Sequence, residues 1–100
     1  MEEYGRVELT QAVCALAVGE GDVRSRLKSA FHYLAQVRED QLRPDVKADF
    51  EWVMKTLVEK DPPGDWWSRV EWNLHRMRNS TGARIAKRIV SIEGRLRTPS

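Results

Sequence analysis

Apolar residues recur along this chain at intervals of three and four positions, the spacing that aligns side chains on one face of an α-helix. The pattern predicts a first helix over residues 8–18, a second from residue 23 to 37 or 38, and a third from Pro44 to the turn at residues 61–64. No stretch alternates apolar and polar residues over the length of a β-strand. We therefore expect an all-α protein.

Two further helices are predicted in the last third of the chain. Asp65 is the expected N-cap of the fourth helix. The apolar face of that helix has spacings of three, four and three residues and consists of Trp67, Val70, Leu74 and Met77. The fifth helix is expected to begin with Asn79 or Ser80 as its cap and to extend to residue 97, with its last turn weakened by Gly94.

Five helices of this length, joined by connections of about 4–7 residues, are typical of antiparallel neighbours in a compact bundle. We expect residues 1–100 to form a single domain, a compact bundle of four or five short helices. Residues 98–100 are a predicted loose tail, and residues 61–64 are a candidate hinge. The predicted core consists of Leu16, Leu27, Phe31, Leu34, Phe50, Val53, Leu57, Val70, Leu74, Ile85, Ile89 and Ile92.

Charge is distributed unevenly along the chain. Residues 66–100 contain eight Lys or Arg and two acidic residues, a net charge of +6, whereas residues 1–65 carry −4. Such a split can mark a protein that binds an anionic partner. It can also mean that the two halves of the fold attract each other, and the sequence leaves both interpretations open.

The basic residues of the predicted fifth helix form a row beside its isoleucine stripe. Arg84, Arg88 and Arg95 lie roughly 90° around the helix from that stripe. Arg78 and Lys87 are close to them in sequence. A guanidinium group can grip a phosphate or a carboxylate in two places, so the row suits a nucleic acid or an acidic protein surface. The alternative is a solvated helix face whose arginines pair within the chain. The acids considered for that pairing are Glu51, Glu59 and Asp61.

Four tryptophans are many for 100 residues, and three of them lie just before the basic helix. Trp66 and Trp67 are adjacent and about 100° apart on a helix, so they cannot both point inward. Because Trp67 lies on the apolar stripe, we expect Trp66 or Trp72 to be partly exposed. Exposed tryptophan near arginine is typical of interface hot spots, and an indole can also stack on a nucleobase. The alternative is a core of large aromatic side chains with one indole edge at the surface.

No catalytic, cofactor-binding or metal-binding pattern accompanies these residues. His32 and His75 lack the spacing of a zinc-binding pair, and Cys14 lies in an apolar run where we expect it to be buried. A single cysteine and the acidic start at residues 1–4 lead us to expect a soluble, cytoplasmic protein without a secretory signal. The longest apolar run, residues 12–18, is too short to cross a membrane.

These patterns favour a small, non-enzymatic protein that binds a macromolecular partner, with an acidic protein surface as the preferred target. The residues expected to contact the partner are Trp66, Trp72, Arg78, Arg84, Lys87, Arg88 and Arg95. Nucleic-acid binding through the basic helix at residues 80–97 is the first alternative. The second is a homodimeric module in which the isoleucine stripe, from Ile85 to Leu96, pairs with its own copy.

Overall fold

The computed structural model describes residues 3–98 of the chain. Within them lie five α-helices, one short 3₁₀-helix and no β-strand, which confirms the predicted all-α class. The elements in chain order are α1 (Arg6–Val18), α2 (Val23–Leu34), η1 (Glu39–Gln41), α3 (Pro44–Leu57), α4 (Arg69–Arg76) and α5 (Asn79–Arg97).

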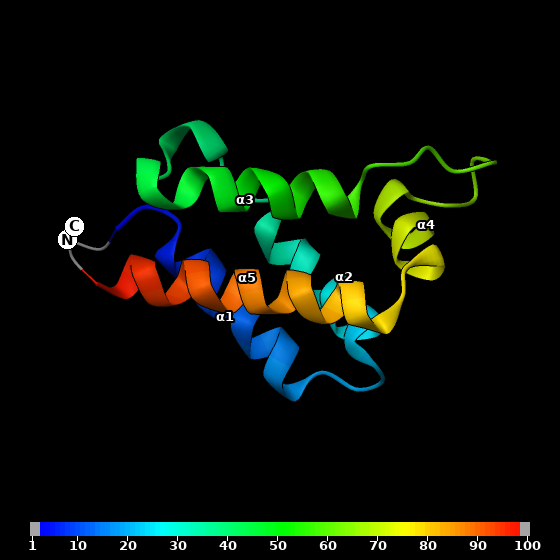
Figure 1. Cartoon of the computed structure of the whole chain (residues 1–100), viewed down its shortest axis with the longest axis horizontal. Coiled ribbons are helices and arrows are strands. Elements are labelled where there is room, and N and C mark those ends of the chain that lie inside the picture. Colours follow the sequence, from blue (N-terminus) through cyan, green and yellow to red (C-terminus); the bar gives the residue numbers. More distant parts are fainter. Residues whose placement is uncertain (1–2, 99–100) are drawn as a thin grey trace.

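The long helices α3 and α5 lie side by side along a molecule that measures 42 × 27 × 20 Å (Figure 1). The longest helix, α5, also contacts α1 and α2, so it is the central element of the bundle. The short helix α4 packs against α2 and α3 at the end of the molecule opposite the start of α1 and the end of α5 (Figure 1). This end carries most of the tryptophans.

Apolar residues on both sides of the candidate hinge, residues 61–64, meet in one core. Every residue of the predicted core is buried except Phe31, which is half-buried against it. The isoleucine stripe of α5 is used entirely inside the bundle, because Ile85 and Ile89 are fully buried and Leu96 is 2% exposed. The stripe is therefore not free to pair with a second copy, and that predicted route to a homodimer is wrong.

The second helix ends earlier than the predicted residue 37 or 38. It stops at Leu34, and the N–H of Val37 bonds back to the Leu34 carbonyl at 3.1 Å in a turn. This turn brings Val37 into the core, where it is 9% exposed. The next N–H, that of Arg38, donates to the Tyr4 hydroxyl at 2.9 Å. The chain thus leaves the helix after Leu34 in a turn that buries Val37 and still gives the Arg38 N–H a hydrogen-bond acceptor.

The fourth helix starts later than predicted, and Asp65 is not its cap. Ser68 is the N-cap: its hydroxyl oxygen accepts a hydrogen bond from the Glu71 N–H at 3.1 Å and donates to the Glu71 carboxylate at 3.0 Å. Residues 68–71 therefore form a variant of the Ser-x-x-Glu capping box. As a consequence, Trp66 precedes the helix and lies in the turn that leads into it.

The last helix is intact to Arg97, so Gly94 does not end it. Arg43 stabilises its C-terminal end by donating hydrogen bonds to the carbonyls of Arg95 and Thr98, each at 2.7 Å. The N-cap of α5 is Arg78, with no side-chain hydrogen bond, rather than the predicted Asn79 or Ser80. Of the predicted loose tail, residues 99 and 100 lie outside the described part of the chain.

Cys14 is exposed, contrary to the prediction that it is buried. The cause is that α1 is apolar on nearly all sides, so the sequence pattern does not indicate which face turns inward. The buried face consists of Leu9, Ala12 and Leu16. Cys14 lies on the opposite face together with Val7 and Val18, which are 51% and 80% exposed.

Candidate interaction surface

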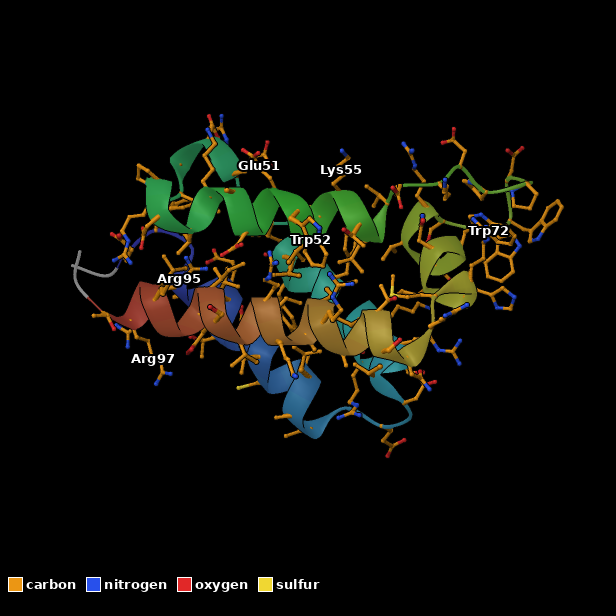
Figure 2. The ribbon with its side chains drawn as sticks, viewed as in Figure 1. Glu51, Trp52, Lys55, Trp72, Arg95 and Arg97 are labelled. Atoms are coloured by element: carbon orange, nitrogen blue, oxygen red, sulfur yellow. The ribbon has the colours of Figure 1, made fainter. Side chains whose placement is uncertain are left out.

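Two members of the arginine row of α5, Arg88 and Arg95, are paired with an acid on α3. Arg88 Nη1 donates to Asp49 Oδ1 at 2.9 Å, and Arg95 Nη2 donates to the other oxygen of the same carboxylate. Figure 2 shows Arg95 directed toward α3, whereas Glu51, one of the acids considered from the sequence, points away from α5. Attraction between the two halves of the fold is therefore confirmed here, with Asp49 as the acid. Arg88 and Arg95 are therefore paired within the chain, at a partly exposed position between the two helices.

An indole on α3 lies beside the same arginines. The guanidinium carbon of Arg88 is 4.7 Å from the centre of the Trp52 ring, and that of Arg84 is 5.9 Å from it. A cation over an indole face is attracted by the ring quadrupole, with about 0.5–1 kcal/mol at exposed sites. Figure 2 shows Trp52 between the two helices. We call Asp49, Trp52, Arg88 and Arg95 the α3–α5 seam; Arg84 lies at its edge.

The seam contains two residues that sequence reasoning did not assign to the site. Asp49 and Trp52 stand three positions apart on α3, so they project from one edge of that helix. An acid and an indole at this spacing on α3 could pair with arginines spaced by one turn on a neighbouring helix. This complementarity between the two sequences is the one feature that could have predicted the seam. It is a weak signal, because it applies only if α3 and α5 are already known to be neighbours.

Three of the predicted cations form no ion pair within the described part of the chain, residues 3–98. They are Arg78, Arg84 and Lys87, and all three are exposed. Arg78 also lines a shallow pocket of about 280 Å³ with Lys60 and Arg76, where α3, α4 and α5 meet. We call Arg78, Arg84 and Lys87 the basic face. It occupies the first half of α5 and its N-cap.

The remaining tryptophans gather around α4. Trp66 is 78% exposed, and Trp72 is half-buried, which confirms the expectation that at least one of the two is partly exposed. The rings of Trp67 and Trp72 meet edge to face with centroids 5.5 Å apart, and His75 lies 4.9 Å from Trp67. Arg76 lies over the Trp72 ring at 5.5 Å. This tryptophan cluster sits at the α4 end of the molecule (Figure 2).

A buried asparagine holds the segment that precedes Trp66. Asn73, 6% exposed on α4, accepts a hydrogen bond from the Lys60 N–H and donates one to the Lys60 carbonyl, both at 3.0 Å. It also donates to the Arg69 carbonyl at 2.7 Å. Arg69 in turn pairs with Asp61 at 3.0 Å. The loop is therefore fastened to α4 close to its starting point.

A larger pocket, of about 490 Å³, lies between the first turns of α2 and α4. Trp67 lines one side, and an ion pair between Lys28 and Glu71 at 3.2 Å joins the two helices there. The hydrogen bond from Lys28, followed by that from Ser68, lowers the pKa of Glu71. The acid therefore stays ionised and keeps its partners over a wider pH range.

The structure thus separates the predicted contact residues into two groups. The arginines of α5 gather along the α3–α5 seam and the basic face, and their indole partner is Trp52. Trp72 belongs to the cluster at the α4 end, where its cationic neighbour is Arg76. Arg78, between the end of α4 and the start of α5, is the predicted residue that links the two groups along the chain.

Across the described residues, no group of three or more His, Cys, Asp or Glu side chains comes together as a metal site. No helix in the same part of the chain combines the length and the apolar character needed to cross a bilayer. Comparison with models of protein families, with curated proteins and with solved structures finds no match to this chain.

Proposed function

We propose that this is a small, non-enzymatic binding protein of the cytoplasm that contacts the acidic surface of a protein partner. The observation that supports the proposal is the basic face, Arg78, Arg84 and Lys87, whose charges are exposed and unpaired within residues 3–98. At the α4 end, Trp66 leaves a large apolar ring in water. Tryptophan and arginine are the side chains most enriched at the energetic centres of protein interfaces.

An acidic protein is a better partner for this surface than a nucleic acid. Asp49 pairs with both Arg88 and Arg95, so two of the five predicted cations are already engaged, and the three groups together keep a net charge of only +1. The three cations that remain would neutralise few phosphates, and such binding is weak and falls steeply with salt. An interface that also buries Trp66 gains affinity from apolar area, which salt weakens much less.

In this proposal the predicted contact residues have two different roles. The basic face and the indoles of Trp66 and Trp72 touch the partner. Arg88 and Arg95 act as positioning residues, because their pairs with Asp49 hold α5 against α3 and so fix where the basic face points. Arg84 is held in part by Trp52, which limits the freedom that it loses when a partner binds.

The test is affinity capture with the immobilised full chain, followed by mass spectrometry, at low and at physiological salt. Two variants probe the surface: the double variant Arg84→Ala with Lys87→Ala, and Trp66→Ala. Lys55→Ala is the matched control, since Lys55 is an exposed cation on the outer side of α3 (Figure 2). We expect both variants to lose a common set of acidic proteins that the control still captures.

Two results would count against the proposal. Capture that is unchanged in both variants, with helical content intact by circular dichroism, would show that neither the basic face nor Trp66 contacts the partner. Capture that disappears after nuclease treatment would favour the nucleic-acid alternative instead. In that case the affinity for an oligonucleotide should fall by orders of magnitude between low and moderate salt.

A further inference from the structure

The pocket between α2 and α4 is an open depression in the surface, lined by both apolar and polar side chains. Its volume of about 490 Å³ lies within the range of roughly 300–1,000 Å³ that is usual for ligand pockets. Trp67 and Leu74 give it an apolar side, and Ser25 and Lys28 from the first two turns of α2 give it a polar side. The pocket adjoins the tryptophan cluster, because Trp67 belongs to both.

Both carboxylates at the pocket already have hydrogen-bond donors. Asp22 accepts from the Ser25 N–H at 3.1 Å and from two N–H groups of Arg24 at 3.1 and 3.0 Å. Glu71 accepts from the Ser68 hydroxyl at 3.0 Å and from Lys28 at 3.2 Å. Neither acid therefore needs a cationic ligand. Arg24 is also largely occupied, since its Nη1 donates to a backbone carbonyl at 3.3 Å.

Three polar groups at the pocket still have hydrogen-bonding capacity. The ammonium group of Lys28 has three N–H bonds, of which one is directed to Glu71, and its side chain is 59% exposed. The hydroxyl of Ser25 makes no hydrogen bond to the described residues, and the ring of His75 is exposed at the pocket. Of these three groups only the Lys28 ammonium is a donor alone, since a hydroxyl and a neutral imidazole can each donate or accept, and its two remaining N–H bonds fit an anionic acceptor such as a carboxylate. The flat apolar surface of Trp67 fits an aromatic ring.

We propose that this pocket receives an aromatic side chain of the protein partner, next to an acidic residue in the partner's sequence. The ring would pack on Trp67 and Leu74, and the neighbouring carboxylate would bind the Lys28 ammonium beside Glu71. This inference rests on the proposed function, because it takes the partner to be an acidic protein. It adds an anchor for the partner: the pocket is open in the free protein, and an aromatic side chain packed there would be shielded from water only once the partner covers it.

The test uses the full chain labelled with ¹⁵N. The indole N–H of each tryptophan gives its own NMR signal, assigned by single Trp→Phe variants. Three short peptides are titrated: one with phenylalanine between acidic residues, one with alanine in its place, and one with phenylalanine between asparagine and glutamine. We expect the first to shift the Trp67 indole signal saturably. The other two should bind at least about tenfold more weakly, which corresponds to roughly 1.4 kcal/mol.

Two variants in the pocket, Lys28→Ala and Ser25→Leu, locate the site, with Lys55→Ala as the control. Lys28→Ala should weaken the first peptide several-fold, whereas Lys55→Ala, on the outer side of α3, should leave its affinity unchanged (Figure 2). Ser25→Leu should block the pocket by volume, because the hydrogen bond to Asp22 comes from the backbone N–H of Ser25 and survives the substitution. Neither variant removes a core contact, so both should fold.

Failure of this inference differs from failure of the proposed function. If both acidic peptides bind equally and shift only the amide signals around Arg84 and Lys87, the pocket assignment is overturned and the acidic-partner proposal stands. If none of the three peptides moves the Trp67 signal, the pocket assignment is again overturned. The capture experiment with Arg84, Lys87 and Trp66 variants then decides the proposed function separately.

Discussion

Arg88 on α5 donates a hydrogen bond to Asp49 on α3 at 2.9 Å, across the line where the two longest helices meet. The second oxygen of the same carboxylate receives Arg95, so one acid holds two arginines that are seven residues apart on α5. A single acidic side chain in the N-terminal half thus fastens the basic helix along two turns of its length. The arrangement leads to the first of four predictions.

Replacing Asp49 with Asn should destabilise the fold. The variant keeps the shape but loses the charge, and Asp49 is only 32% exposed, so we expect the free energy of unfolding to fall by about 1–2 kcal/mol. Urea denaturation followed by circular dichroism measures this change. The control is Asp40→Asn, whose pair with Arg38 is 3.6 Å long and mostly exposed; it should change stability by less than about 0.5 kcal/mol. Equal effects of the two variants would contradict the role assigned to Asp49.

Two neighbouring substitutions should separate the true cap of α4 from the one expected from the sequence. Ser68→Ala removes the oxygen that accepts the Glu71 N–H, and loss of such a cap costs about 1 kcal/mol. Asp65→Ala removes an exposed side chain that caps nothing and should leave stability nearly unchanged. Chemical denaturation of both variants provides the comparison. A larger effect at Asp65 than at Ser68 would refute the observed start of the helix.

Two glycines of α5 should respond in opposite ways to alanine. A Cβ at Gly94 would meet only the tip of Arg97 at 3.9 Å, so Gly94→Ala should gain the helix propensity of about 0.5–1 kcal/mol. A Cβ at Gly82 would lie 2.9 Å from Val23 and 3.4 Å from Leu27, where α5 crosses α2. Overpacking of this kind costs about 1–3 kcal/mol and should cancel or exceed the gain. Thermal unfolding should show a higher Tm for the first variant and no increase for the second.

Acid should weaken the fold partly through Glu71. Hydrogen bonds from Lys28 and then Ser68 lower its pKa below the usual 4.5. The stabilisation is therefore complete above pH 4.5 and is lost as the pH falls through the lower pKa of the folded state. The pKa values of Asp22 and Asp45 are lowered as well, first by the Ser25 N–H and by Arg43, respectively.

Urea unfolding over the acid range measures this dependence. Glu71→Gln should make the loss of stability below pH 4.5 less steep without abolishing it, because other lowered carboxyl groups remain. Lys28→Ala should raise the pKa of Glu71 toward its usual value, which a side-chain NMR titration can follow. A pH profile that is identical in the wild type and Glu71→Gln would show that this acid does not contribute.

Helical periodicity predicted the bundle well where a helix has one apolar and one polar face. This is why the buried faces of α3 and α5 agree with the sequence, down to Phe50 and Ile89. The same reasoning failed for α1, where apolar residues surround the helix and Cys14 turned out to be exposed. It also missed the cap of α4, since Asp65 and Ser68 are both good cap residues and only the Glu71 carboxylate distinguishes them.

The candidate site was less predictable than the fold. The expectation that Trp66 or Trp72 is partly exposed holds, although its premise does not, because Trp66 and Trp67 both precede α4 instead of lying on it. The pairing of Arg88 with Asp49 depends on how two helices distant in sequence rotate against each other, and no local pattern specifies that rotation. The positive charge of residues 66–100 was therefore visible in the sequence, but its division between internal pairs and free surface was not.

The three hydrogen bonds of Asn73 affect how much conformational freedom the loop between α3 and α4, which carries Trp66, has to lose on binding. One amide fixes both backbone groups of Lys60 and a carbonyl of α4, so the loop that leads to Trp66 is anchored where it leaves α3. A binding segment that is already ordered loses little conformational entropy on association. In the proposed complex, the ordering that Asn73 provides at Lys60 would leave only residues 61–66 of this loop to lose freedom when a partner binds.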